Sequence, residues 1–135
     1  MNFKNTIEDC RWINLPTVHR DEGDLTVIET LPFDIKRVYY IWNIPDLSVR
    51  GDHAHRKLEQ VMVAMHGEFG LWLDDGSDRQ FFWFDNPAKG LYIPSGLWRE
   101  LINFRNDAVC MVLASKKYDE KDYIRGYNQF LEYRR

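Results

Sequence analysis

Short runs of β-branched and aromatic residues, separated by turn-forming residues, constrain the fold of this chain more than any other feature. Gly, Pro, Asp and Asn lie between the runs, and they favour turns because their backbone preferences suit them. About nine such runs predict an all-β sandwich or barrel, and a small jelly roll is the member of that class that commonly encloses a ligand. The expected strands cover residues 11–13, 25–29, 35–42, 58–65, 69–73, 80–84, 91–93, 98–104 and 108–114.

Several segments between the runs carry strong turn signals. Residues 74–77, Asp-Asp-Gly-Ser, predict a hairpin turn because Gly and Asp tolerate positive φ. We expect further turns at residues 66–68 and 105–107. Residues 118–125 depart from the strand pattern, and Asp119, with an acidic residue three positions later, predicts a short capped helix there.

Length and composition indicate a single folded domain, residues 1–135, large enough for a hydrophobic core. The formal net charge of −3 argues against a protein dedicated to nucleic acid or to membrane surfaces. No apolar run approaches the roughly 20 residues of a membrane span, and the N-terminus lacks the apolar core of a signal peptide. Two cysteines are too few for a disulfide framework, so we expect a reduced, cytoplasmic protein.

The segment from Arg50 to Gln60 holds two of the four histidines, His53 and His55, in a highly charged setting. In an extended segment, residues two positions apart point to the same face, so the two imidazoles should lie side by side. Such a pair indicates a metal site, an acid/base pair or a charged surface.

The spacing around these histidines resembles the two sequence motifs of the cupins. The first motif is matched by His53, His55, the residue at position 60 and Gly67, and the second by residues 94–103, Pro-Ser-Gly-Leu-Trp-Arg-Glu-Leu-Ile-Asn. The resemblance implies a single cupin domain, a small jelly-roll barrel, to which the tail adds a short C-terminal helical segment.

Two positions depart from the metal-binding cupins, which hold an ion with both histidines, a glutamate of the first motif and a histidine of the second. Here these last two positions carry Gln60 and Arg99. Glutamine is a weak neutral ligand, and arginine is a permanent cation that cannot coordinate a metal. If the first motif is aligned one residue earlier, Glu59 would supply the carboxylate. Strand alternation, however, places Glu59 on the face opposite to Gln60. We therefore expect no metal.

Two imidazoles, an arginine and several tyrosines inside a barrel suit proton transfer on an anionic substrate. Histidine exchanges protons near neutral pH, arginine binds phosphate through paired hydrogen bonds, and aromatic rings offer a stacking surface to a nucleotide base. The alternative is a partly exposed histidine cluster on a charged loop. The motif spacing, with Arg99 at a ligand position, favours the proton-transfer pair.

Residues 81–84, Phe-Phe-Trp-Phe, are apolar on both faces of an expected strand. One face of such a strand belongs to the core, and the other predicts a subunit interface rather than a base-stacking site. We therefore expect a homodimer.

Six blocks of the chain, in order and spacing, resemble the dTDP-4-keto-6-deoxyglucose 3,4-ketoisomerases, cupin enzymes akin to the dTDP-sugar 3,5-epimerases. The resemblance runs from about Gly23 to Phe130. It implies an isomerase of deoxysugar biosynthesis (for lipopolysaccharide, S-layer or other glycans) that converts a dTDP-4-keto-6-deoxyhexose to its 3-keto isomer through an enediolate, without a cofactor. The blocks are residues 32–41, 50–60, 73–76, 86–91, 98–100 and 118–125.

The family resemblance also implies roles for the histidines. His53 is the expected acid/base for the carbon atoms, and His55 would move the proton between O3 and O4, or the two roles are reversed. Arg99 and a tyrosine, Tyr39 or Tyr40, would stabilise the developing oxyanion. We favour Tyr39, since it shares a face with Arg37.

The remaining expected site residues would bind the substrate, and Arg50 would either bind the diphosphate or hold its loop. The rival functions are a 3,5-epimerase-like cupin, a non-catalytic sugar-nucleotide-binding cupin and a metal-dependent oxygenase. The configuration of the product at C4 is left open. The expected substrate-binding residues are Arg37, Arg50, Gln60, Arg99 and Glu100.

Overall fold

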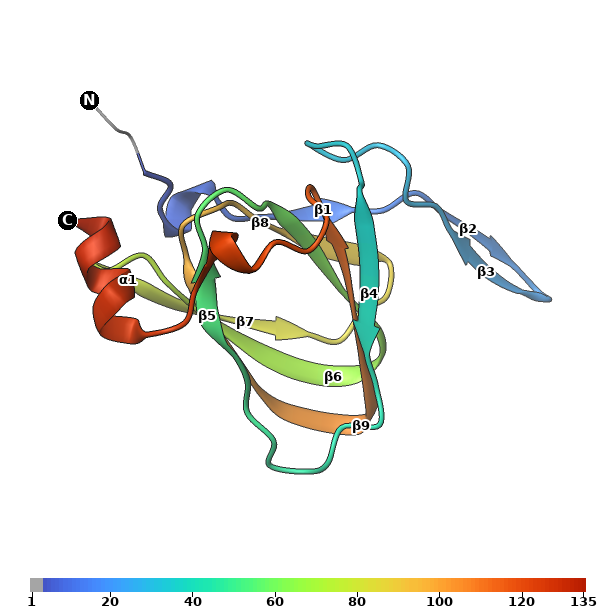
Figure 1. Cartoon of the computed structure of the whole chain (residues 1–135). Coiled ribbons are helices and arrows are strands. Elements are labelled where there is room, and N and C mark those ends of the chain that lie inside the picture. The colour runs from blue at the N-terminus through green and yellow to red at the C-terminus, as the bar shows by residue number, and fades with distance from the viewer. Residues whose placement is uncertain (1–3) are drawn as a thin grey trace.

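The computed structural model describes residues 4–135 and consists mainly of strands; residues 1–3 of the expected domain lie outside the described residues. A short 3-10 helix, η1 (Ile7–Asp9), precedes the first strand, and the chain ends in a helix (Figure 1). The elements that follow η1 are β1 (Arg11–Asn14), β2 (Thr17–Arg20), β3 (Gly23–Thr26), β4 (Arg37–Ile41), β5 (Arg50–His55), β6 (Gln60–Asp74), β7 (Arg79–Phe84), β8 (Lys89–Ile93), β9 (Trp98–Ala114), η2 (Glu120–Asp122), β10 (Tyr123–Ile124) and α1 (Tyr127–Arg134).

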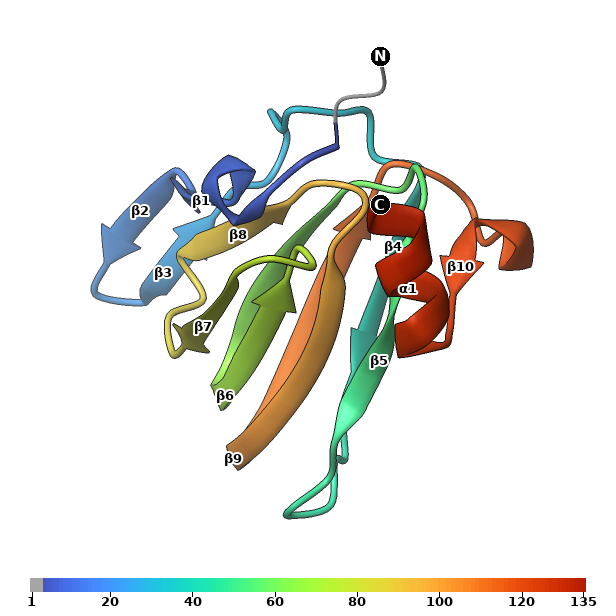
Figure 2. The same cartoon turned by 90° about the vertical axis from the view of Figure 1, so that its left-hand side faces the viewer.

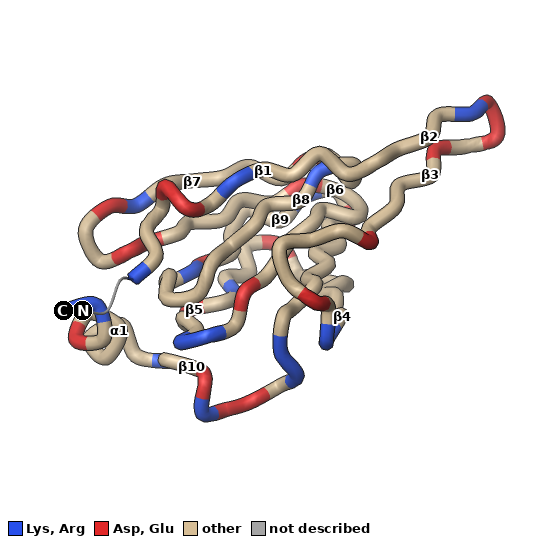
Figure 3. Tube along the Cα trace, turned by 90° about the horizontal axis from the view of Figure 1, so that it is seen from above, with Lys and Arg blue, Asp and Glu red and all other residues tan. Residues whose placement is uncertain are grey.

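Eight of the strands form one antiparallel sheet that curls into a half-barrel (Figure 2). The strand order is β1-β8-β6-β9-β5-β10, with β4 added to β9 and β7 added to β6. This confirms the predicted all-β, jelly-roll-like architecture. A separate hairpin, β2–β3, projects away from the sheet (Figures 1 and 3).

The two longest strands, β6 and β9, correct two of the predicted turns. Residues 66–68 and 105–107 do not end strands, because β6 and β9 pair almost from end to end and bend together at this place. The register shifts there, and Asn106 and Asp107 adopt left-handed φ values of 56° and 55°. Residues that favour turns thus bend a continuous pair of strands, as bulges do at barrel corners.

The C-terminal segment confirms the predicted helical ending and extends it. Asp119 caps the 3-10 helix η2 by accepting a hydrogen bond from the backbone N–H of Lys121. The longer helix α1 follows at residues 127–134, beyond the segment in which a helix was expected. Between them, β10 pairs with β5 and thereby brings the tail beside the histidine segment.

The hydrophobic core lies on the concave side of the curled sheet and is formed by the inward side chains of β6, β8 and β9. Some of these side chains also form the floor of a cavity. In β7 the side chains alternate, so Phe82 and Phe84 are buried in this core whereas Phe81 lies on the outside against Trp72. Of the described residues, none belongs to a helix long and apolar enough to cross a membrane.

We predict that Gly67→Ala destabilises the fold by about 3 kcal/mol. Gly67 has φ +66°, and an added Cβ would lie 2.4 Å from the carbonyl oxygen of Arg105. Urea unfolding measures the loss. The matched control is Gly126→Ala, where the added Cβ would meet only Gln129 at 3.8 Å, so a loss below about 1 kcal/mol is expected. Equal losses of stability in the two variants would contradict the requirement for glycine at position 67, where β6 and β9 bend.

Candidate functional site

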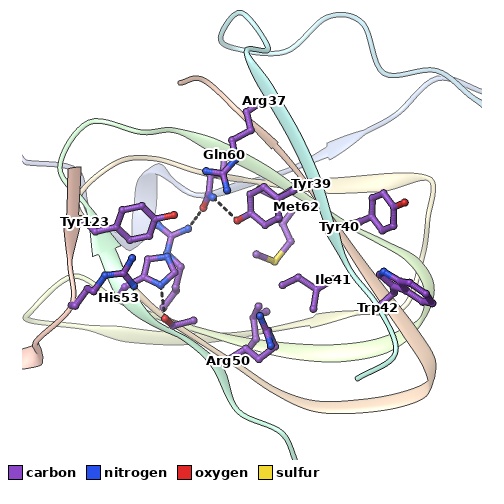
Figure 4. Close-up of a pocket in the computed structure, with 15 residues that line it drawn as sticks. Arg37, Tyr39, Tyr40, Ile41, Trp42, Arg50, His53, Gln60, Met62 and Tyr123 are labelled. Carbon is purple, nitrogen blue, oxygen red and sulfur yellow. Dashed lines mark hydrogen bonds between the residues drawn. The ribbon is translucent and has the colours of Figure 1, made fainter. Parts of the chain in front are cut away.

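A cavity of about 580 Å³ opens into the curled sheet between β4, β5 and the tail segment (Figure 4). Its floor is apolar and is formed by Ile41, Met62, Leu101 and Val112. Its walls and mouth are basic and aromatic, and among the described residues no Asp or Glu lines it. The polar and aromatic lining consists of Arg37, Tyr39, Tyr40, Trp42, Arg50, His53, Gln60, Arg99, Tyr123 and Arg125.

The two histidines of β5 lie together at one wall of this cavity. His53 lines the cavity, and His55 is buried directly behind it with 1% of its surface exposed. Their Nε2 atoms are 3.1 Å apart, and Nδ1 of His53 donates to the carbonyl oxygen of Gly51 (Figure 4). The pairing of β5 with β9 shifts register between Gly51 and His53, and Gly51 and Asp52 have positive φ. This irregularity of the backbone determines the orientation of the His53 side chain.

Both rings lie in an environment that disfavours the protonated form. Burial, followed by the nearby Arg99 guanidinium, lowers the pKa of His53 from 6.5 to about 4. The same two causes lower the pKa of His55. The pair is therefore neutral at neutral pH, which is the form of imidazole that accepts a proton.

A chain of hydrogen bonds links Arg99 to Tyr39 across the cavity wall. The guanidinium of Arg99, which is 2% exposed, donates to the side-chain carbonyl of Gln60. The amide of Gln60 in turn donates to the hydroxyl of Tyr39 over 3.1 Å (Figure 4). A hydroxyl that accepts this bond keeps its own proton free for a ligand oxygen. Burial raises the pKa of Tyr39, which keeps the hydroxyl protonated.

Three further arginines surround the mouth of the cavity, and basic positions are visible along β4 and β5 in Figure 3. Arg37 lies 4.6 Å from the centroid of the Tyr39 ring, and Arg125 lies 4.3 Å from that of Tyr123. Arg50 extends from the start of β5 and is exposed. Guanidinium groups in such an arrangement can bind a phosphate group by paired hydrogen bonds.

The structure brings together most of the residues predicted to form the site. His53, Tyr39, Arg37, Arg50, Gln60 and Arg99 all line the cavity, and His55 contacts His53 from behind. The orientation of β4 is now defined, since Tyr39 points into the cavity whereas Tyr40 is 62% exposed (Figure 4).

Glu100 does not lie with the others. It follows Arg99 in β9, so strand alternation places it on the opposite face of the sheet. There it lines a separate small cavity with Asp74, Arg79 and Tyr127, and we leave it out of the site. Glu59 likewise faces away from Gln60, and its carboxylate accepts a hydrogen bond from Tyr92 at 2.6 Å.

Three residues near the histidines were not predicted, and all of them come from the tail. Tyr123 packs against both imidazoles, with ring centroids 5.0 Å from His53 and 4.4 Å from His55. Arg125 is on the same side of the tail, and Asp122 lies behind His55. The spacing of Tyr123 and Arg125, two residues apart, would have indicated a shared face if the segment had been read as a strand.

The donor set facing the histidines does not fit a divalent metal ion. Within residues 4–135, no three side chains of His, Cys, Asp or Glu gather closely enough to ligate one. The position that faces the two rings is occupied by the guanidinium of Arg99, a permanent cation, and its neighbour Gln60 is already bound to it.

Comparison with known proteins agrees with this geometry. Residues 8–135 match the family model described as FdtA, WxcM-like, C-terminal. The chain is 47% identical over 124 residues to the TDP-4-oxo-6-deoxy-α-D-glucose-3,4-oxoisomerase of Aneurinibacillus thermoaerophilus, covering 90% of this chain and 89% of that protein.

Solved structures of similar proteins carry related names. A mutant of the 3,4-ketoisomerase QdtA from Thermoanaerobacterium thermosaccharolyticum, in complex with TDP-4-keto-6-deoxyglucose, is 36% identical, with a TM-score of 0.92 and 95% of each chain covered. The TDP-quinovose 3,4-ketoisomerase WlaRB of Campylobacter jejuni is 41% identical, with a TM-score of 0.88, and the match covers 93% of this chain and 99% of that one. By its sequence along nearly the whole length, the chain belongs to the FdtA family.

Proposed function

We propose that the protein is a sugar-nucleotide 3,4-ketoisomerase that converts a dTDP-4-keto-6-deoxyhexose to its 3-keto isomer. The observation that carries this proposal is a neutral pair of histidines, His53 and His55, at the wall of a cavity lined by arginines and tyrosines. Relatives that are 36% to 47% identical carry the names of TDP-sugar 3,4-ketoisomerases, which supports it.

The reaction requires a base, an oxyanion stabiliser and a proton donor, and it needs no external oxidant. The 4-keto group acidifies the proton on C3, and His53, the ring that lines the cavity, accepts that proton. The electron pair left by the C3–H bond forms the enediolate. A proton is then delivered to C4 while the proton of the O3 hydroxyl is transferred to O4 and O3 becomes the carbonyl, so C3 is oxidised and C4 is reduced within one molecule.

The enediolate oxygen would be stabilised by Arg99 and by the hydroxyl of Tyr39. Both groups are fixed before the reaction by the hydrogen bonds through Gln60. Preorganised donors in a site from which water is excluded stabilise developing charge strongly. His55 does not line the cavity, so its part in proton transfer is exerted through His53.

The mouth of the cavity would bind the nucleotide part of the substrate. Arg37, Arg50 and Arg125 provide cationic donors for the diphosphate. The exposed rings of Tyr40 and Trp42 offer a surface on which the base can stack.

We further propose that the protein acts as a cytoplasmic homodimer in deoxysugar biosynthesis. The outer face of β7 carries Phe81, which is 37% exposed, and Trp83, which is half-buried, and a second subunit would cover this aromatic surface. The projecting β2–β3 hairpin exposes Val18 and Leu25, which a second subunit would cover. The thiols of Cys10 and Cys110 are free, as is usual in a reducing compartment.

Incubation with dTDP-4-keto-6-deoxyglucose in deuterated water tests the reaction itself. We expect a 3-keto product with deuterium at C4 and recovered substrate with deuterium at C3, because the enediolate is protonated from exchangeable groups. Proton NMR of the sugar measures both positions. Labelling at C3 and C5 would instead identify a 3,5-epimerase, and no labelling would leave only a binding protein.

We predict that His53→Asn lowers kcat by roughly 10²–10⁴-fold, the contribution of a positioned base. Binding of dTDP, followed by calorimetry, should be nearly unchanged, because the arginines at the mouth are untouched. The matched control is His66→Asn, which changes an exposed histidine bound to the carbonyl of Asp107 at the barrel corner. A His53→Asn variant with the wild-type rate would contradict the assignment.

The pH dependence of kcat/KM follows from the lowered pKa of His53. A base with a pKa near 4 stays unprotonated as the pH falls through 6.5, the usual pKa of histidine, and it is lost only as the pH approaches 4. We therefore expect the acid limb of the profile to lie well below 6.5. Steady-state rates in buffers of constant ionic strength measure it, and an acid midpoint at 6.5 or above would show that Arg99 and burial do not control this ring.

A further inference from the structure

Asp122 is a buried carboxylate that the mechanism above does not use. It lies at the end of η2, where its two oxygens accept hydrogen bonds from the backbone N–H groups of Lys57 and Leu58 at 2.9 Å and 3.1 Å. Its Oδ2 atom also lies 3.5 Å from Nδ1 of His55. The side chains of Asp122 and His55 are 5% and 1% exposed, so both groups lie away from bulk solvent.

These contacts form a row of three links. Nδ1 of His53 faces the carbonyl oxygen of Gly51, the two Nε2 atoms face each other, and Nδ1 of His55 faces the carboxylate of Asp122. A carbonyl and a carboxylate only accept hydrogen bonds, so the outer links each need a proton on the histidine.

Two neutral imidazoles carry one proton each, and the outer links use both of them. The two Nε2 atoms, 3.1 Å apart, are then left as facing acceptors with no proton between them. If His55 instead held its proton on Nε2, that proton would be donated to Nε2 of His53. The buried Nδ1 of His55, which has no hydrogen-bond partner among the described residues, would then turn its lone pair towards a full negative charge on Asp122 at 3.5 Å. We weigh this contact with a carboxylate as the more costly of the two, above the contact between two neutral nitrogen atoms. The position of Asp122 therefore selects between the two tautomers of His55.

We propose that Asp122 is a positioning residue for proton transfer: it holds His55 as the Nδ1–H tautomer, so that the facing Nε2 atoms of His53 and His55 take up the substrate proton together. The inference rests on the proposed function for its last part, the origin of the proton. The tautomer itself is a property of the free protein.

The proton balance of this step is complete. The C3–H bond breaks, its electron pair remains in the enediolate, and the proton occupies the gap between the two Nε2 atoms. The pair then bears one positive charge, which the carboxylate of Asp122 and the enediolate offset. The same proton, or one exchanged with solvent, is returned when the C4–H bond forms, and the hydroxyl proton of O3 is transferred to O4, so that C3=O3 forms as C4=O4 becomes an alcohol.

The charges around the pair show why a carboxylate is needed. Arg99 on β9, Arg37 on β4 and Arg125 after β10 all disfavour a positive charge on His55. Asp122 acts from the side of His55 away from the cavity. In the ligand-free protein the 3.5 Å contact is longer than a strong hydrogen bond, and such contacts commonly tighten in the substrate complex.

The test is nitrogen NMR of the histidine side chains in the full-length protein, which reports the tautomer of each ring without reference to activity. We expect Nδ1 of His55 to be protonated and its Nε2 to be unprotonated at neutral pH. In Asp122→Asn, we expect the population to shift towards the Nε2–H form and kcat to fall by roughly 10–100-fold with little change in KM. An Nε2–H tautomer in the wild-type protein would overturn the proposal even if the variant fails to fold.

The control variant is Asp119→Ala, which removes the cap of the same η2 helix without contacting His55. It should keep the wild-type tautomer and rate, and an equal loss of kcat in both variants would assign Asp122 a merely structural role. A tautomer unchanged in Asp122→Asn would also overturn the proposal. If the wild-type protein shows no isomerase activity, the proposed function fails while the tautomer measurement still decides the role of Asp122.

Discussion

Arg99 is a guanidinium buried inside an all-β barrel, and the rest of the site is arranged around that charge. Burying a cation is strongly unfavourable unless hydrogen bonds replace the lost water. Gln60 provides one, and the carbonyl oxygen of Leu97 accepts another at 3.4 Å. Burial and, after it, this cation lower the pKa of His53 and so keep a neutral base beside a positive charge. Gly51 permits the close approach, because an added Cβ there would lie 3.1 Å from the carbonyl oxygen of Arg99.

The pairing of β6 with β9 explains how residues distant in the sequence come to share this site. At the beginning of β6, Gln60 pairs with Ala114, while Arg99 lies near the beginning of β9 and pairs with Leu73. The curl of the sheet turns both side chains inward, and β5 and β4 add His53 and Tyr39 from neighbouring strands. The tail closes the arrangement through β10, which places Tyr123 opposite His55. A site assembled from five strands in this way is held by backbone ladders rather than by loops.

Much of the fold and of the candidate site could be predicted from the sequence, for identifiable reasons. Strand alternation and motif spacing are local properties, and they sufficed for His53, Gln60 and Arg99. The corner of the barrel was mistaken for turns because Gly67 and Asn106 have the same backbone preferences in a turn and in a bulge.

The remaining differences have two origins, one in local alternation and one in contacts between residues far apart along the chain. Glu100 belongs to the block of residues 98–100 that resembles the ketoisomerases, but adjacent residues of a strand face opposite sides, and Glu100 therefore lies on the face opposite to Arg99. The expected short helix at Asp122 is present as η2, but the contact of Asp122 with His55 spans 67 positions of the sequence and arises only through the pairing of β10 with β5. Such contacts become visible only when the strands are placed in space.

The replacement of a metal ligand by arginine has a chemical logic that joins these observations. A metal ion bound to two histidines would occupy the nitrogen lone pairs that must accept a proton in an isomerase. The guanidinium of Arg99 brings positive charge to the same place through N–H donors, so it can stabilise an enediolate oxygen and leave both Nε2 atoms free. The cation alone would make the pair too weak a base. In the proposal above, the carboxylate of Asp122 behind His55 offsets part of this effect, because it stabilises the positive charge that the pair bears once it has taken up a proton.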